Sequence, residues 1–79
     1  PDGEIWQEIL GKIEKKLNPQ IFDSWFRYIE FERVEGNTLF LRASAVNRDW
    51  VQRFYFDLLK ESLGDYQITW NILEMEEAA

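Results

Sequence analysis

The sequence predicts an α+β domain in which helices pack on a three-stranded sheet, in the order α-α-β-β-α-β. Apolar residues recur at helical spacing over residues 4–17, 19–29 and 45–63, and they alternate with polar residues over residues 29–43 and 66–72. Turn-forming residues separate these segments, at Asn18-Pro19, Glu35-Gly36-Asn37 and Gly64-Asp65. A chain of 79 residues has room for one such core.

The first predicted helix covers residues 4–17, with Lys15 and Lys16 in its last turn, where positive charge suits the helix dipole. Its apolar positions form one stripe: Ile5, Trp6, Ile9, Leu10, Ile13 and Leu17. Helical phase therefore places Trp6 in the core. Against this, Trp6 lies in the first turn of the chain, where little protein is left to cover it, and tryptophan is enriched in interface anchors.

The second predicted helix begins at Asn18-Pro19, because asparagine caps helices well and proline suits the first helical position. Its apolar face consists of Ile21, Phe22, Trp25, Phe26 and Ile29. Ile21 lies at the border of this face, beside polar Gln20 and Ser24. The sequence is therefore equally consistent with Ile21 at the edge of the core and with Ile21 on a docking surface.

Two alternating segments that meet at Glu35-Gly36-Asn37 predict a β-hairpin, in which Phe40 is the one aromatic residue out of phase. The third strand also alternates, with its inward residues at Tyr66, Ile68, Trp70 and Ile72. The sequence leaves open which strand of the hairpin the third strand joins.

A single third helix is predicted over residues 45–63, with Ser44 as its cap. Steps of about 100° per residue around this helix give a broad buried arc, formed by Trp50, Val51, Phe54, Tyr55, Leu58 and Leu59. Val46 and Phe56 fall outside the arc, among charged neighbours. Single apolar side chains at a surface are ordinary, but these two are also candidates for a docking surface.

The composition argues against an enzyme. Histidine and cysteine are both absent, which removes most transition-metal sites and the usual nucleophile and acid-base arrangements. The chain lacks the glycine-rich phosphate-binding motifs, and a solvated strand face explains Glu30 and Glu32 better than a catalytic pair does. We therefore expect no catalytic residue, no metal and no cofactor.

The net charge of -6 repels phosphate backbones. A KH-like or RRM-like module for single-stranded nucleic acid is the alternative function, although a GXXG loop and basic strands with stacking aromatics are missing. Arg42, Arg48 and Arg53 are its candidates for weak contact with a single strand.

No apolar run approaches a membrane span of roughly 20 residues, so we expect a cytoplasmic protein without a membrane partner.

Four sequence blocks carry a resemblance to a known family: Ile5-Trp6-Gln7-Glu8-Ile9-Leu10, Leu17-Asn18-Pro19-Gln20-Ile21-Phe22-Asp23-Ser24-Trp25-Phe26, Asn37-Thr38-Leu39, and Asp49-Trp50-Val51 with Tyr55. With the element order, they resemble the N-terminal domain of the bacterial replication initiator DnaA over nearly the whole chain. The resemblance implies a KH-like interaction domain. We expect residues 1–73 to form this domain and residues 74–79 to begin an acidic linker.

The resemblance also implies partners and site residues. The family's domain pairs initiator molecules, docks the replicative helicase and receives species-specific regulators. Trp6 has the place of the tryptophan that serves self-association. The docking surface corresponds to Ile21 and Val46 with their neighbours Gln20 and Asn47. At two of these positions the sequence departs from the family: Ile21 replaces an acidic residue, and Val46 replaces an aromatic residue. ATP is expected only in the ATPase domain of a full-length initiator.

Overall fold

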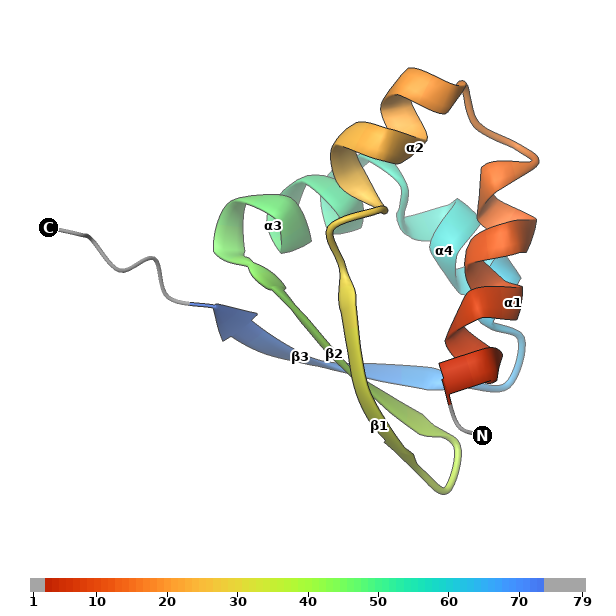
Figure 1. The fold of residues 1–79 in the computed structure, drawn as a ribbon, viewed down its shortest axis with the longest axis vertical. Coiled ribbons are helices and arrows are strands. Elements are labelled where there is room, and N and C mark those ends of the chain that lie inside the picture. Colours follow the sequence, from red (N-terminus) through yellow and green to blue (C-terminus); the bar gives the residue numbers. More distant parts are fainter. Residues whose placement is uncertain (1–2, 74–79) are drawn as a thin grey trace, which may run out of the picture.

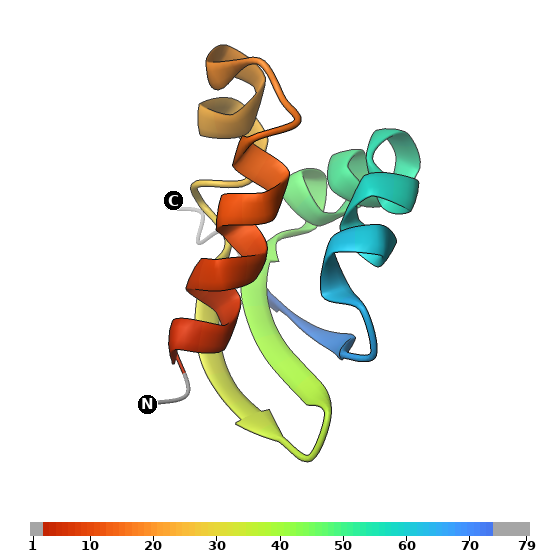
Figure 2. The same ribbon diagram turned by 90° about the vertical axis from the view of Figure 1, so that its right-hand side faces the viewer.

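A computed structural model describes residues 3–73 of the chain. Its elements are α1 (Gly3–Glu14), α2 (Pro19–Trp25), β1 (Glu30–Glu35), β2 (Thr38–Ser44), α3 (Ala45–Phe54), α4 (Phe56–Leu63) and β3 (Gln67–Leu73). Figures 1 and 2 show the helices gathered toward one side of a strongly twisted sheet. This arrangement confirms the predicted α+β fold. The predicted acidic linker, residues 74–79, lies outside the described residues.

The sheet has the order β1-β2-β3, so β2 is its central strand. β1 and β2 form the predicted antiparallel hairpin. β3 runs parallel to β2, in an unbroken register from Thr38 opposite Gln67 to Ser44 opposite Leu73. A parallel pair needs a crossover connection, which here consists of α3 and α4. The structure thus answers the question of which strand β3 joins.

The hairpin contains a β-bulge that places two neighbouring side chains on one sheet face. Phe31 pairs with Leu41 and Arg33 pairs with Phe40, so Glu32 is the extra residue. The bulge directs Arg33 to the outer face of the sheet, away from the helices. The Arg33 guanidinium carbon lies 3.9 Å from the centre of the Phe40 ring. Phe40 is therefore out of phase because it belongs to the outer face, where a cation covers its ring.

The core lies between the inner face of the sheet and the helices. Alternation predicted the inward residues of β2 correctly, since Leu39, Leu41 and Ala43 are all buried. Ile68 and Trp70 of β3 pack against the same cluster and are partly buried. The helices and the segment that follows α2 contribute the remaining buried apolar side chains: Trp6, Ile9, Ile13, Phe22, Phe26, Ile29, Val51 and Leu59.

The first helix is shorter than predicted, because α1 ends at Glu14 and not at residue 17. The backbone N–H of Leu17 donates to the carbonyl oxygen of Glu14 at 3.4 Å, a tighter pattern than that of an α-helix. Asn18, which precedes Pro19, is extended with φ −61° and ψ 138°, as the steric demand of a following proline favours. The chain therefore leaves the helix before Leu17, although Leu17 still packs against the core.

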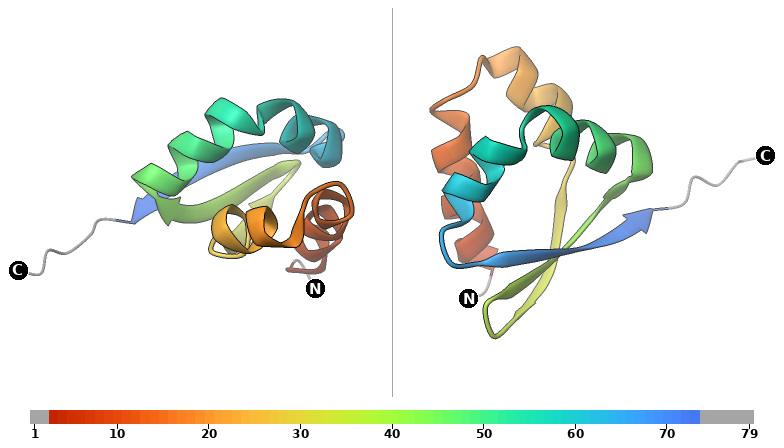
Figure 3. Two further views of the ribbon diagram at one scale, coloured as in Figure 1. Left: turned by 90° about the horizontal axis from the view of Figure 1, so that it is seen from above. Right: turned by 180° about the vertical axis from the view of Figure 1, so that it is seen from behind.

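The prediction of one continuous third helix is wrong. Tyr55, with φ −128° and ψ 21°, separates α3 from α4, and the helices change direction there (Figure 3). The Tyr55 ring packs edge-on against Phe26 of α2 at 5.8 Å between ring centres. The break lets α3 pack against α2 while α4 packs against α1. One straight helix would have a single continuous apolar stripe, which could not pack against both α1 and α2.

Candidate functional site

Aromatic side chains form a stack between α2 and α3. The ring centres of Trp25 and Trp50 lie 4.7 Å apart with an interplanar angle of 12°, and those of Trp50 and Phe54 lie 4.5 Å apart with the rings tilted by 46°. Val46 lines one hollow together with Trp50 and Phe54, and Val46, Trp50 and Phe54 are 70%, 40% and 56% exposed. We call these four residues the α2–α3 ridge. The ridge is a continuous apolar surface in a chain of strong net charge.

Helical spacing explains how the ridge forms. Val46, Trp50 and Phe54 follow one another at intervals of four residues, so they lie on one face of α3. The prediction that Trp50 and Phe54 are buried is wrong for a geometric reason. α2 is only seven residues long, so it packs against part of α3 and leaves the rest of this face open. A short second helix beside a longer aromatic face is the sequence signal that could have revealed the ridge.

The docking residues that the resemblance implies lie in three different environments. Ile21 is half-buried and lies one helical turn before Trp25, whereas Val46 lies one turn before Trp50. Both therefore adjoin the stacked tryptophans. Gln20 is exposed, and its backbone N–H donates to the Asn18 side chain at 2.7 Å.

Asn47 is not on this surface, contrary to expectation. It is only 7% exposed, and its side-chain nitrogen is buried with no hydrogen-bond partner among the described residues. Its backbone N–H donates to the Ser44 hydroxyl at 3.1 Å, so Ser44 caps α3 as predicted. The α2–α3 ridge therefore does not include Asn47.

Trp6 lies in the core, as helical phase indicates, and the expectation that little protein is left to cover it is wrong. Its side chain is 1% exposed, and its indole N–H has no hydrogen-bond partner among the described residues. α1 packs against α2, α4 and β1, and Trp6 belongs to the buried cluster that these elements enclose. Trp6 therefore offers no ring surface to a second molecule in this conformation, and its role in self-association stays a prediction.

The arginines considered for nucleic-acid contact belong to two elements: Arg42 is on β2, whereas Arg48 and Arg53 are on α3. Arg42 lies on the outer face of the sheet, where its Nε donates to Glu32 at 2.8 Å. Arg48 donates to the neighbouring Asp49 at 2.8 Å, and Arg53 lines a shallow hollow beside the ridge. The ion pairs of Arg42 and Arg48 remove much of the positive potential with which these two side chains would attract a phosphate backbone. The arrangement gives the nucleic-acid alternative little support.

Glu32 is the centre of a polar network across the three strands. Its carboxylate accepts hydrogen bonds from Arg42 of β2 and Asn71 of β3, at 2.8 Å and 3.1 Å. These contacts, the Asn71 hydrogen bond first, lower the pKa of Glu32 against the opposing effect of desolvation. The network ties the bulge of β1 to the far edge of the sheet.

The lowered pKa of Glu32 predicts a pH dependence of stability. A carboxyl group with a depressed pKa in the folded state contributes stability that is present above its ordinary pKa and is lost as the pH falls through the folded-state value. The free energy of unfolding should therefore decrease between about pH 6 and about pH 3 more in the wild type than in Glu32→Gln. Urea unfolding across this range measures the difference, and parallel curves for both proteins would contradict it.

Residues 3–73 contain neither a metal-binding cluster nor a membrane-spanning helix. No group of three or more histidine, cysteine, aspartate or glutamate side chains is placed there to hold a metal ion. No helix in this part of the chain is long and apolar enough to cross a membrane.

The fold and the α2–α3 ridge define a small α+β domain whose apolar surface is typical of domains that bind other proteins. Residues 3–65 match the DnaA N-terminal domain, and the chain belongs to that family. The chromosomal replication initiator protein DnaA of Nostoc punctiforme is 26% identical over 66 residues, which cover 82% of this chain and 14% of that protein. The protein of the same name from Geotalea daltonii is 29% identical over 80 residues, with 94% and 18% covered. The chain thus spans less than a fifth of the length of these relatives.

Proposed function

We propose that this chain is the interaction domain of a chromosomal replication initiator, and that its α2–α3 ridge docks the replicative helicase and initiation regulators. The observation that carries the proposal is the cluster of exposed Val46, Trp50 and Phe54, in which Trp50 stacks on partly buried Trp25. Membership of the DnaA N-terminal domain family supports the cellular role. Catalysis and ATP binding are no part of the function proposed for this domain.

The ridge has the physical properties of a protein-binding surface. Tryptophan is enriched among residues that contribute most to binding free energy. Since Trp25 and Trp50 already stack on each other, their rings lose little conformational freedom when a partner covers them. Ile21 and Val46 extend this surface with aliphatic side chains, so we expect the partner to present apolar groups there.

Self-association is the second part of the proposal, and it does not require an exposed Trp6. Leu10 and Gly11 of α1 line an open hollow of about 310 Å³. Trp6 anchors α1 in the core, so its substitution would change this surface indirectly. Weak helicase docking and weak self-association both become effective when many initiators are held close together, because the effective concentration of the domain is then high.

Glutamate substitutions test the docking role. We expect Val46→Glu and Ile21→Glu each to weaken helicase binding roughly tenfold, because each places an unpaired charge in an apolar contact. The melting temperature should stay close to that of the wild type for Val46→Glu, whose side chain is mostly solvated. Titration of the purified helicase with the chain, followed by calorimetry, measures the affinity.

Thr69→Glu is the matched control, because it adds the same charge on the outer face of the sheet, away from the helices. Its affinity for the helicase should equal that of the wild type. Unchanged affinity in both ridge variants would place the docking surface elsewhere and would refute the proposal.

A further inference from the structure

The two edges of the sheet are built differently. β1 carries the Glu32 bulge and charged side chains, two features that protect an edge strand from pairing with another chain. β3 has neither. Its seven residues, Gln67–Leu73, include no charged residue, no proline and no glycine, and they pair with β2 without a register shift. β3 is thus an edge strand without these protective features.

The backbone of β3 has hydrogen-bonding groups that point away from the sheet. The N–H of Gln67 donates to the carbonyl oxygen of Asn37 at 2.8 Å, on the β2 side. Successive residues of a strand direct these groups to opposite edges, so those of Ile68, Trp70 and Ile72 point to the free edge. Among the described residues, β2 is the only strand that pairs with β3. An added strand would therefore find donors and acceptors at every second residue.

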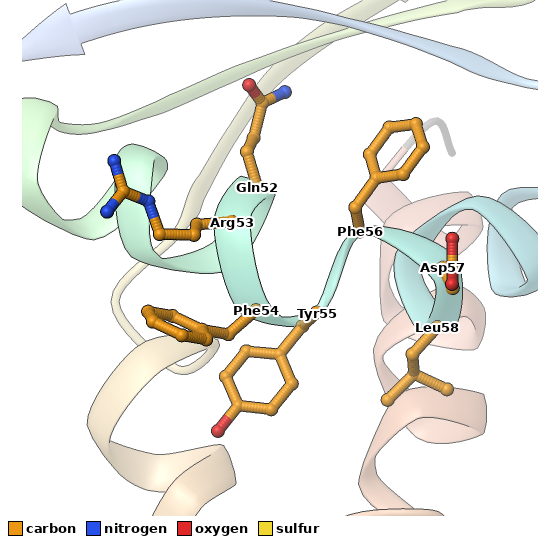
Figure 4. A pocket seen from close by; sticks show the side chains of 7 residues that line it. All are labelled: Gln52, Arg53, Phe54, Tyr55, Phe56, Asp57 and Leu58. Atoms are coloured by element: carbon orange, nitrogen blue, oxygen red, sulfur yellow. The ribbon is translucent and has the colours of Figure 1, made fainter.

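A groove beside this edge could receive side chains of an added strand. Its volume is about 220 Å³, and Ile68 and Trp70 line it from the strand, whereas Phe56, Leu59 and Leu63 line it from α4. Figure 4 shows Phe56 on the side of the helices that faces the strands, while Phe54 and Tyr55 point toward α2. The groove and the α2–α3 ridge therefore lie on different sides of the α3–α4 segment.

The groove has an electrostatic preference. Among the described residues that line it, Lys60 alone carries a charge. The Lys60 ammonium lies 5.8 Å from the centre of the Phe56 ring and forms no ion pair with any described residue. A segment with a carboxylate near this position would gain a partner in Lys60. The β3 strand of a second copy carries no charged residue, so it would bring no carboxylate to Lys60.

We propose that β3 is a strand-addition site for an extended segment of another protein, with apolar residues at alternate positions and a carboxylate that meets Lys60. Main-chain hydrogen bonds to Ile68, Trp70 and Ile72 supply the affinity, and the groove against α4 selects the alternate side chains. This site is separate from the α2–α3 ridge. It allows one domain to hold two partners at the same time.

Two synthetic probes test the proposal. Each is a blocked seven-residue peptide in which valine and threonine alternate, with glutamate in place of one terminal valine in the first and lysine in the second. We expect the glutamate peptide to slow amide hydrogen exchange at Ile68, Trp70 and Ile72, as NMR measures residue by residue. It should bind roughly fivefold more tightly than the lysine peptide, which is the effect of one exposed ion pair.

Lys60→Glu should reverse the preference between the peptides, whereas Lys12→Glu, the same change on α1, should leave it as in the wild type. Val46→Glu should not alter peptide binding, so failure of the ridge and failure of the β3 site are distinguishable. Unchanged exchange at saturating glutamate peptide would overturn the proposal, and so would equal binding of both peptides.

Two controls without peptide address the other possible occupants. Slower exchange of the same three amides at higher chain concentration would assign the edge to a second copy. Slower exchange on addition of oligothymidylate would assign it to single-stranded nucleic acid. Either result would overturn a peptide-binding role, and we expect neither.

Discussion

Trp6→Ala should lower the free energy of unfolding by about 3–5 kcal/mol, the usual cost of truncating a buried aromatic side chain. Trp6 is 1% exposed and packs in the same cluster as Ile9 and Ile13 of α1. Removing it leaves a cavity between α1 and the rest of the core. Urea unfolding followed by circular dichroism measures the loss. Self-association should fall in parallel, because the surface of α1 depends on this anchor.

Trp6→Phe is the matched variant, and we expect its stability to stay within about 1.5 kcal/mol of the wild type. The smaller ring loses some packing, but the substitution also removes an indole N–H that has no hydrogen-bond partner among the described residues. An unpaired buried donor costs about 1–3 kcal/mol, so the two effects oppose each other. Wild-type stability in Trp6→Ala would show that Trp6 is on the surface, where its ring could contact a second molecule directly.

Trp50→Ala should weaken helicase binding by about 2 kcal/mol or more, equivalent to roughly thirtyfold in affinity. Trp50 lies in the middle of the ridge, where it stacks on Trp25 and contacts the tilted ring of Phe54. Its loss removes the central ring and leaves both neighbours without support. Because Trp50 is 40% exposed, we expect a smaller loss of stability, of about 1 kcal/mol from the lost ring contacts.

Tyr28→Ala is the control for this prediction. Tyr28 is also an exposed aromatic residue, but its ring stacks on none of the ridge residues. Calorimetric titration with the helicase should give the wild-type affinity for Tyr28→Ala. Equal losses in the two variants would mean that exposed aromatic side chains contribute in general and that the ridge has no special role.

Local sequence signals predicted most of the fold. Asn18-Pro19 and Ser44 mark the starts of α2 and α3, and their side chains accept the expected capping hydrogen bonds. Alternation identified all three strands and their inward residues. These features depend on near neighbours in the chain, so the sequence contains what is needed to predict them.

Most of the errors concern features that depend on residues far apart in the chain. The early end of α1 is an exception, because it follows from the neighbouring Asn18-Pro19. No glycine or proline marks the break at Tyr55, which follows from the need of α3 and α4 to pack against different helices. Trp50 and Phe54 have the helical phase of core residues, but the length of α2 decides that they remain exposed. The partner strand of β3 and the bulge at Glu32 likewise depend on pairing across the sheet.

The candidate site was predictable in part. Ile21, Gln20 and Val46 are on or beside the surface, in keeping with the resemblance, while Trp6 and Asn47 are buried. A resemblance to a family shows which positions correspond, but it does not show whether the side chains at those positions are exposed in this chain. The Trp25–Trp50 stack and the groove beside β3 were missed, because each is formed by side chains from two separate elements.

Hydroxyl-radical footprinting of the chain with and without the replicative helicase is the most direct test of the proposed docking surface. Oxidation of a side chain decreases where a partner covers it, so the method locates the contact without a substitution. We predict protection of Val46, Trp50 and Phe54, with Phe40 on the outer face of the sheet unchanged. Protection of Phe40 without protection of the ridge, or no protection at a helicase concentration that saturates binding, would contradict docking through the α2–α3 ridge.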